Sequence, residues 1–405
     1  MEGLKDIVGD VALGEPIKCV DMHTTGEPTR IIYSGYPRLT GTLLQQRAQA
    51  LKEYDHIRKR LMLEPRGHWD MYGAILRPET ELVAAGKADM GVLFTHNDGY
   101  STMCGHATIA LGRFLVDADE SIFPQGKKLR YDKDISSFHL SLHVPSGPLE
   151  VTVPALPNGK SDPSRPVSFI SVPSFATGVS VKVPLSPEYR WPELGNRTCV
   201  TADFSYGGAF YCMIDAKELG FPEGLANLDL SKMDHASKQL KAAVNANAEL
   251  SFCTKHPITE EMSYLYSIMI VDMSLRAAPA STKNGMAIPD HAGEETGLCF
   301  FANQQIDRSP TGGAVAARVA LAYNKGKLSI GQRWTYHSLL SQETGVGGFT
   351  GSVIEALPSS LEQPHVRVRV EGTAHYTGMF TAVVEDRDSL SMNGFALHQL
   401  KGCQR

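Results

Sequence analysis

Alternating hydrophobic and polar residues predict that this chain is built mainly from β-strands. Short runs that alternate, or that are continuously apolar, recur along the sequence, and each predicts a strand: residues 17–23, 31–33, 90–95, 138–144, 149–153, 167–172, 209–214, 265–271, 366–370 and 379–384. Residues 42–61 and 231–250 instead space apolar positions three or four apart, as on one face of a helix. Because strands and helices do not alternate regularly, the pattern favours an α+β fold over a doubly wound parallel sheet.

Two further segments of helical character look alike although they lie half a chain apart. Residues 104–110 read CGHATIA and residues 311–317 read TGGAVAA. Each begins with a thiol or a small polar residue, continues with glycine, and then consists mostly of small apolar residues. A motif of this length also recurs by chance, so coincidence and internal duplication both stay open. A duplication would give two similar halves, each with one glycine-led helix start.

A glycine-led helix start is a place where an anion can bind. The first N–H groups of a helix lack intrahelical partners, the helix dipole adds positive potential there, and glycine lets a ligand approach the backbone closely. Cys104 directly precedes such a start. This position favours the thiolate over the reference cysteine, whose pKa is about 8.5. The alternative is that Cys104 only caps a tightly packed, buried helix.

Composition and charge exclude several classes of protein. Lys and Arg total 39 and Asp and Glu total 44, a net charge of −5, which argues against nucleic acid as a partner. No stretch approaches the ~20 apolar residues of a membrane helix, and the first residues do not resemble a signal peptide. The seven cysteines are scattered without a C-x-x-C pair, so we expect neither a zinc site nor a disulfide framework, and a cytoplasmic location. The length of 405 residues suggests two or three domains.

Three other chemical interpretations have little support. His139 and His143 fall on a predicted strand without an evident third ligand, so no metal site is expected there. The glycine-rich residues 345–351 do not have the spacing of a dinucleotide-binding loop. A cysteine-protease pairing of Cys104 with His106 is not expected either, because that pair normally comes from distant segments.

Several of these segments together resemble the proline racemase family. The residues MCGH at 103–106 and DRSPTGG at 307–313 look like its two active-site motifs, and VDMHTTGEPTR at 20–30 resembles its N-terminal signature. Residues 206–208 and 372–374 fit later blocks of the family, and the resemblance runs from about residue 17 to 398.

The resemblance implies an α+β fold of two similar lobes. Each lobe would be a curled β-sheet around a central helix, as in diaminopimelate epimerase, with the active site between the lobes. We expect residues 15–180 and the C-terminal segment 386–405 to form the lobe that carries Cys104. Residues 181–385 would form the lobe that carries Asp307 and Thr311.

The chain departs from the racemase pattern at one position. Racemases and hydroxyproline epimerases of the family carry cysteine in both motifs, whereas this chain has Thr311 in the second. Inversion needs an acid–base group on each face of the substrate, and a threonine hydroxyl is too weak an acid to serve as a base near pH 7. The combination of cysteine and threonine is similar to a hydro-lyase branch of the family, which dehydrates trans-3-hydroxy-L-proline to pyrroline-2-carboxylate. A racemase or hydroxyproline 2-epimerase is the alternative, and a binding protein without catalysis is a further one.

The resemblance also implies roles for side chains. Cys104 would remove the Cα proton, and Thr311 would face the substrate from the other side as a hydrogen-bonding spacer. Asp307 would pair with the ring ammonium, and His106 would add a polar contact near the same nitrogen. Phe301 would pack against the ring, unless it is only a core residue.

The two helix starts would bind the substrate carboxylate. Backbone N–H groups of Gly105 and His106 would contact it from one side, and those of Gly312 and Gly313 from the other. The same groups would stabilise the enolate-like charge that develops when the Cα proton leaves. The resemblance implies no metal and no organic cofactor, a small imino acid as the only ligand, and a homodimer.

Overall fold

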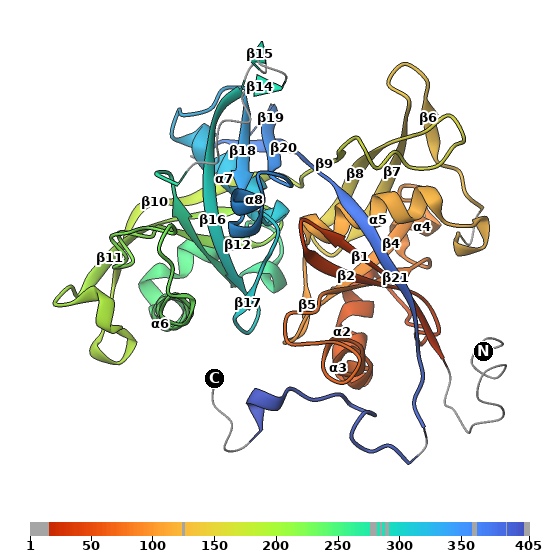
Figure 1. Cartoon of the computed structure of the whole chain (residues 1–405), viewed down its shortest axis with the longest axis horizontal. Helices are drawn as coiled ribbons and strands as arrows, with labels where there is room; N and C mark the ends of the chain where they lie inside the picture. The colour runs from red at the N-terminus through yellow and green to blue at the C-terminus, as the bar shows by residue number, and fades with distance from the viewer. Residues whose placement is uncertain are drawn as a thin grey trace.

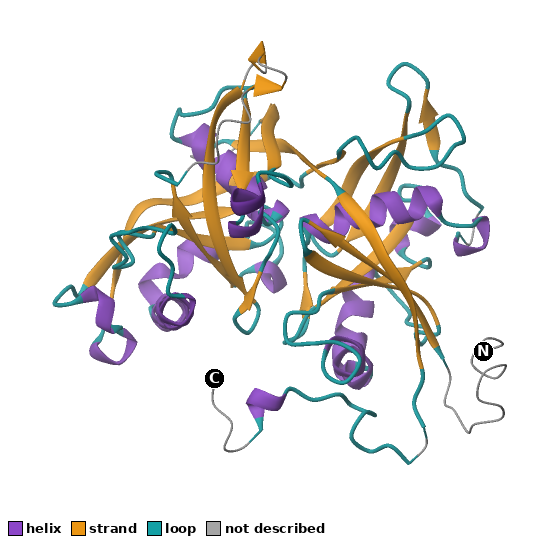
Figure 2. Cartoon of the chain, viewed as in Figure 1, coloured by secondary structure: helices purple, strands orange, loops and turns teal. Residues whose placement is uncertain are grey.

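The computed structural model describes residues 16–123, 126–275, 282–283, 286–287, 291–358, 363–385 and 387–400. Two lobes lie side by side, one around helix α5 (Gly105–Asp117) and one around helix α7 (Gly312–Asn324), as Figure 1 shows. In both lobes strands surround the central helix (Figure 2). The expected α+β fold, with two lobes and a central helix in each, is confirmed.

The first lobe is a sheet that curls around α5. Its strands are β1 (Ile17–Thr24), β2 (Glu27–Ser34), β3 (Gly73–Arg77), β4 (Met90–Thr95), β5 (Tyr100–Ser101), β6 (Arg130–Asp132), β7 (Ser137–Val144), β8 (Gly147–Pro154), β9 (Val167–Ile170) and β21 (Ala374–Ala382). The main order is β21–β1–β2–β3–β4–β7–β8–β9, with β2–β3 and β4–β7 parallel. Helices α2 (Leu43–Glu53), α3 (Asp55–Met62) and α4 (Glu81–Ala84) lie outside this sheet.

The second lobe is a closed barrel around α7. Its strands are β10 (Ser174–Pro184), β11 (Cys199–Tyr206), β12 (Phe210–Asp215), β13 (Leu265–Asp272), β16 (His291–Phe301), β17 (Gln305–Ile306), β18 (Arg333–His337), β19 (Phe349–Leu357) and β20 (His365–Gly372). The ring runs β10–β11–β12–β13–β16–β18–β19–β20 and closes where β20 pairs with β10. Strand β20 also pairs with β9, so the two lobes share one hydrogen-bonded network of strands.

The remaining elements are peripheral. They are helices α6 (Leu230–Ala246) and α8 (Leu339–Thr344), the short pair β14 (Thr282–Lys283) and β15 (Met286–Ala287), and the 3-10 turns η1 (Glu120–Ile122), η2 (Pro187–Tyr189), η3 (Pro192–Leu194), η4 (Ala248–Thr254), η5 (Glu260–Met262) and η6 (Leu397–Gln399). None of the helices in the described part of the chain has the length and apolar character that a membrane crossing requires.

The central helices are buried on every side, which explains their composition. All residues of α5 from Gly105 to Val116 are buried, and so are those of α7 from Gly312 to Leu321. A helix that is surrounded by strands needs small residues where the strands pass closely. A Cβ atom at Gly112, for example, would lie 2.9 Å from a methyl carbon of Val151 in β8.

Most predicted strands are found at the predicted places, but some helices and strands differ in extent. The helix predicted for residues 42–61 is interrupted at Tyr54, where α2 ends and α3 begins. The helix predicted for 231–250 ends at Ala246 and is followed by η4. The strand predicted for 379–384 is β21, which begins at residue 374.

Strand β21 also changes the division into lobes. We expected residues 181–385 to belong to the second lobe, but β21 pairs along its length with β1 of the first lobe. The chain therefore returns to the first lobe just after β20, at about residue 373. Further on, Ser391 and Phe395 contact Arg66 and Glu64 of the first lobe.

Candidate active site

The two central helices begin against each other at the contact between the lobes. A Cβ atom at Gly105 would lie 2.4 Å from Cα of Gly312, and one at Gly312 would lie 2.7 Å from Cα of Gly105. Only glycine at both positions allows the two backbones to approach this closely. The free N–H groups of both helix starts therefore border the same small space.

A small pocket lies where these helix starts meet. Its lining is Tyr72, Met103, Cys104, Gly105, His106, Tyr211, Tyr266, Phe301, Asp307, Thr311, Gly312 and Gly313. All eight residues singled out from the sequence are in this set. The structure thus brings together residues that come from both lobes and are up to about half a chain apart. It adds Met103 and the tyrosines Tyr72, Tyr211 and Tyr266, which the sequence analysis did not single out.

Cys104 forms a close pair with His106. The Sγ atom is the N-cap of α5: it accepts a hydrogen bond from the backbone N–H of Ala107 at 3.4 Å and lies 3.2 Å from Nδ1 of His106. The backbone oxygen of His106 accepts a hydrogen bond from Oγ1 of Thr24 at 2.9 Å. We did not expect the two side chains to pair, but residues two apart at a helix start can turn toward each other. Because Cys104 and His106 lie at the same helix start, their pairing does not indicate a cysteine protease.

His106 is poised to carry a positive charge. Burial opposes its charged form, but the Cys104 thiolate and the carboxylate of Asp307 outweigh that effect and raise the pKa of His106 well above its usual value. Its Nδ1 atom lies 3.8 Å from Oδ2 of Asp307. The three side chains can therefore form a thiolate–imidazolium–carboxylate cluster.

Asp307 is held by its own turn and lies near a second buried carboxyl group. Oδ1 of Asp307 accepts a hydrogen bond from the backbone N–H of Ser309 at 2.7 Å. Glu27 is completely buried, and its Oε2 accepts from the backbone N–H of Arg308 at 2.8 Å. Burial and the charge of Asp307 raise the pKa of Glu27 to about 8. Glu27 is therefore mostly neutral near pH 7.

Thr311 occupies the position in α7 that Cys104 occupies in α5, but its geometry differs. Its backbone is left-handed (φ 63°, ψ 86°), and its side chain does not cap the helix. This conformation is unusual for a β-branched residue and costs on the order of 1–3 kcal/mol. The backbone N–H of Thr311 donates to Oγ of Ser309 at 3.2 Å.

A second thiol lies close to Thr311 without lining the pocket. The Sγ atom of Cys299 in β16 lies 2.9 Å from Oγ of Ser267 and close to the side chain of Thr311. Burial, reinforced by the charge of Asp307, raises the pKa of Cys299 to about 12. Cys299 therefore remains a neutral thiol at neutral pH and does not replace the missing cysteine of the second motif.

Three buried tyrosines complete the pocket. The hydroxyl of Tyr72 is 2.5 Å from Oγ of Ser101, and its ring meets the ring of His106 edge-on at 4.7 Å. Burial, and then nearby ionisable groups that include Cys104, raises the pKa of Tyr72, Tyr211 and Tyr266 well above the usual value. Their hydroxyls therefore stay protonated and can donate hydrogen bonds into the pocket.

Comparison with known proteins identifies the class to which this fold and pocket belong. The family model described as proline racemase matches residues 19–396. The chain belongs to the proline racemase family.

Within this family, the chain is similar to dehydratases and to an epimerase of hydroxyproline. The chain is 38% identical to the trans-L-3-hydroxyproline dehydratase of Pongo abelii and to the trans-3-hydroxy-L-proline dehydratase of Homo sapiens, each over 95% of this chain and 96% of the relative. A 3-hydroxyproline 2-epimerase of Burkholderia multivorans (strain ATCC 17616 / 249) is 32% identical over 94% of this chain and 98% of its own.

A solved structure gives the same fold. It is a hydroxyproline epimerase from Agrobacterium vitis with bound trans-4-OH-L-proline, and it has a TM-score of 0.74 at 19% identity over 96% of this chain and 97% of its own. At this identity the likeness supports the fold and not the activity.

Proposed function

We propose that this protein is a hydro-lyase that dehydrates trans-3-hydroxy-L-proline to pyrroline-2-carboxylate. Relatives that are 38% identical over nearly the whole chain carry the name of this activity. The observation that carries the proposal is the unequal pair of N-cap residues at one pocket, a cysteine at Cys104 and a threonine at Thr311. One thiol suffices for elimination, whereas inversion needs an acid–base group on each face.

The substrate carboxylate binds between the two helix starts. The N–H groups of Gly105 and His106 in α5 and of Gly312 and Gly313 in α7 donate to it, and both helix dipoles favour its charge. Asp307 pairs with the ring ammonium, because it is a buried carboxylate at the pocket wall. Phe301 packs against the pyrrolidine ring.

Cys104 removes the Cα proton, and the helix starts stabilise the charge that develops on the carboxylate. In trans-3-hydroxy-L-proline the carboxylate and the hydroxyl lie on opposite faces of the ring, so the Cα hydrogen and the hydroxyl share a face. The C3–O bond then breaks, the proton on Cys104 goes to the departing hydroxide to form water, and an enamine remains. The enamine tautomerises to the imine pyrroline-2-carboxylate. This is a syn elimination in which a single residue acts first as base and then as acid.

Two neighbours support Cys104 in this role. The imidazolium of His106, 3.2 Å from Sγ, stabilises the thiolate before the reaction. The protonated hydroxyl of Tyr72 can donate a hydrogen bond to the same sulfur, with which it interacts. Thr311 fills the opposite side of the pocket and does not return a proton to Cα.

The alternative is a 3-hydroxyproline 2-epimerase, because one relative carries that name at 32% identity. Epimerisation needs a second base opposite Cys104. The only other cysteine near this side, in the described part of the chain, is Cys299, and its thiol does not line the pocket.

Incubation with trans-3-hydroxy-L-proline separates these activities. NMR of the reaction should show loss of the C3 hydroxyl and formation of the imine, without the C2 epimer. Accumulation of the epimer with the hydroxyl retained would show that the protein is an epimerase and not a dehydratase. No turnover, with binding of the amino acid, would indicate a binding protein. The homodimer and the cytoplasmic location expected from the sequence remain predictions.

A further inference from the structure

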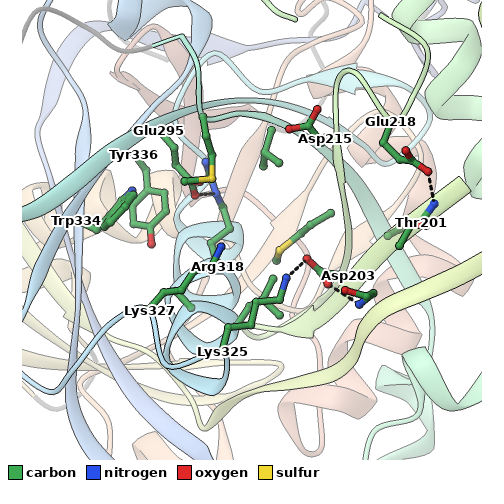
Figure 3. Close-up of a pocket in the computed structure, with 17 residues that line it drawn as sticks. Thr201, Asp203, Asp215, Glu218, Glu295, Arg318, Lys325, Lys327, Trp334 and Tyr336 are labelled. Carbon is green, nitrogen blue, oxygen red and sulfur yellow. Dashed lines mark hydrogen bonds and ion pairs between the residues drawn. The ribbon is translucent and has the colours of Figure 1, made fainter. Parts of the chain in front are cut away.

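The second lobe contains a cavity of its own at the end of α7 that lies away from Cys104. Its volume is about 350 Å³, within the size range of small-molecule sites. Helix α7 supplies Arg318, Leu321 and Ala322 to one wall, Lys325 follows directly after the helix, and strands and loops of the barrel supply the other walls (Figure 3). At 1.5 Å per residue, Arg318, the first residue of α7 at this cavity, lies about 9 Å along the helix axis from Gly312 in the active pocket.

Buried donors without acceptors are the first sign of a ligand. Arg318 is only 4% exposed; its Nε donates to Oε1 of Glu295 at 2.6 Å, and its guanidinium lies 4.5 Å from the ring centre of Tyr336. Among the described residues, Nη1 and Nη2 of Arg318 and Nε1 of Trp334 have no hydrogen-bond partner. A buried donor without an acceptor is destabilising, and more so when it is charged. Acceptor oxygens from outside the chain would remove this cost.

The acidic residues of the cavity, in contrast, already have donors. Asp203 accepts from the backbone N–H of Ser180 at 2.8 Å and pairs with Lys325. Glu218 accepts from the backbone N–H of Thr201 at 2.8 Å. The groups of the cavity that still lack hydrogen bonds are therefore mostly donors. A ligand with acceptor oxygens would pair with them, which favours an anionic ligand over a cationic one.

Much of the remaining lining is apolar, and part of it is aromatic, although Asp215 and Lys327 also line the cavity. Met213, Val271, Leu321 and Trp334 are among the residues of this apolar surface. Such walls fit a ligand with a flat hydrocarbon body. The two Nη atoms of Arg318 are covered in the structure, so neighbouring side chains must shift before a ligand reaches them.

We propose that this cavity is an effector site for a small organic carboxylate with a planar apolar body. The carboxylate binds Arg318 through Nη1 and Nη2, and the body packs against Trp334 and Leu321. Occupancy changes turnover through α7, because Gly312 at the start of this helix is in close contact with Gly105 and any displacement of α7 moves the carboxylate-binding N–H groups. The effect on turnover rests on the proposed function, whereas binding does not.

Calorimetry on the full chain tests the site directly. The probe is naphthalene-2-carboxylate, the matched neutral control is naphthalene-2-carboxamide, and saturating pyrrole-2-carboxylate occupies the active pocket throughout. We expect the carboxylate to bind at least tenfold more tightly than the amide. Equal affinity for the two compounds, or no binding of either, would overturn the proposal.

Two variants locate the binding. Arg318→Met should weaken binding of the carboxylate at least tenfold. Because removal of Arg318 also leaves Glu295 unpaired, Ala322→Trp provides a second variant that fills the cavity and leaves this ion pair in place; it should abolish binding with unchanged circular dichroism. Binding that survives Ala322→Trp in a folded protein refutes the site. In the wild type, saturation with the probe, without pyrrole-2-carboxylate, should change turnover at least twofold, and unchanged turnover refutes the effector role.

Discussion

The starts of α5 and α7 are built alike but differ in the residue that precedes the first glycine. Both helices have 13 residues, both are enclosed by strands, and their first glycines touch. At α5 the N-cap is Cys104, with an extended backbone and a sulfur that accepts from Ala107. At α7 it is Thr311, with a left-handed backbone and no cap from its side chain. A nearly symmetric scaffold thus carries an asymmetric pair of side chains.

The residues around Cys104 and Thr311 increase the difference between the two helix starts. His106 supplies a cation next to Cys104, whereas the residue in the corresponding place of α7 is Gly313. A thiol close to Thr311, that of Cys299, is held neutral by burial. In the proposed mechanism the scaffold binds a carboxylate from both sides, and proton transfer is confined to the side of Cys104.

Removal of the thiol should have the largest effect. Cys104→Ser replaces sulfur by a nearly isosteric oxygen with a far less acidic proton, so kcat for dehydration should fall by roughly 10²–10⁴-fold with the melting temperature little changed. Cys253→Ser and Cys199→Ser are controls away from the pocket and should keep most of the activity. Normal turnover of the Cys104 variant would show that another group is the base.

Loss of the charge on Asp307 should have the second largest effect on activity. Asp307→Asn keeps an oxygen for the N–H of Ser309 but removes the partner of the ammonium, so KM should rise by roughly 10–100-fold, as expected for loss of a charged hydrogen bond of about 1.5–3 kcal/mol. Steady-state kinetics with trans-3-hydroxy-L-proline measure this. An unchanged KM would mean that Asp307 only stabilises its turn.

The pH dependence of activity tests the role of the protonated His106, which has no counterpart at the start of α7. The raised pKa of His106 keeps it protonated through neutral pH, and it loses its proton only as the pH rises through that raised value. Activity should therefore fall on the alkaline side. His106→Asn should lower activity at pH 7 about tenfold, slow alkylation of Cys104 by iodoacetamide, and abolish the alkaline fall. An alkaline fall of the same size in the variant would assign it to another group.

A second thiol should produce a smaller, positive effect. Thr311→Cys restores the two-cysteine arrangement, and cysteine fits the left-handed backbone more easily than a β-branched residue does. The variant should gain measurable inversion of L-proline at C2 and keep part of its dehydratase activity. The gain is limited because a catalytic group must lie within roughly half an ångström of its productive position. Thr311→Ser, which adds no thiol, is the matched control and should gain nothing.

The sequence predicted those features that depend on local patterns. The alternating residues 138–144 fall in β7, and the two glycine-led motifs are the starts of α5 and α7. Motif resemblance selected the eight pocket residues because they lie in a few short segments.

The features that the sequence did not predict depend on contacts made in the folded chain. The place of β21 follows from its pairing with β1, more than 300 positions earlier in the chain. Tyr72 precedes β3 in a segment without a recognisable pattern, and its role is visible only from its contacts with Ser101 and His106. Glu27 lies within the N-terminal signature, but only burial beside Arg308 and Asp307 distinguishes it from a turn residue.

Incubation of the wild-type protein with L-proline in heavy water tests most directly whether only one face of the pocket carries a base. L-Proline has no hydroxyl to eliminate, so any proton that Cys104 removes must return to Cα. We expect slow incorporation of deuterium at Cα with the L configuration retained, as measured by NMR and chiral chromatography. Efficient formation of D-proline would show that Thr311, or a water bound to it, is a competent acid–base group, and would contradict the one-thiol mechanism.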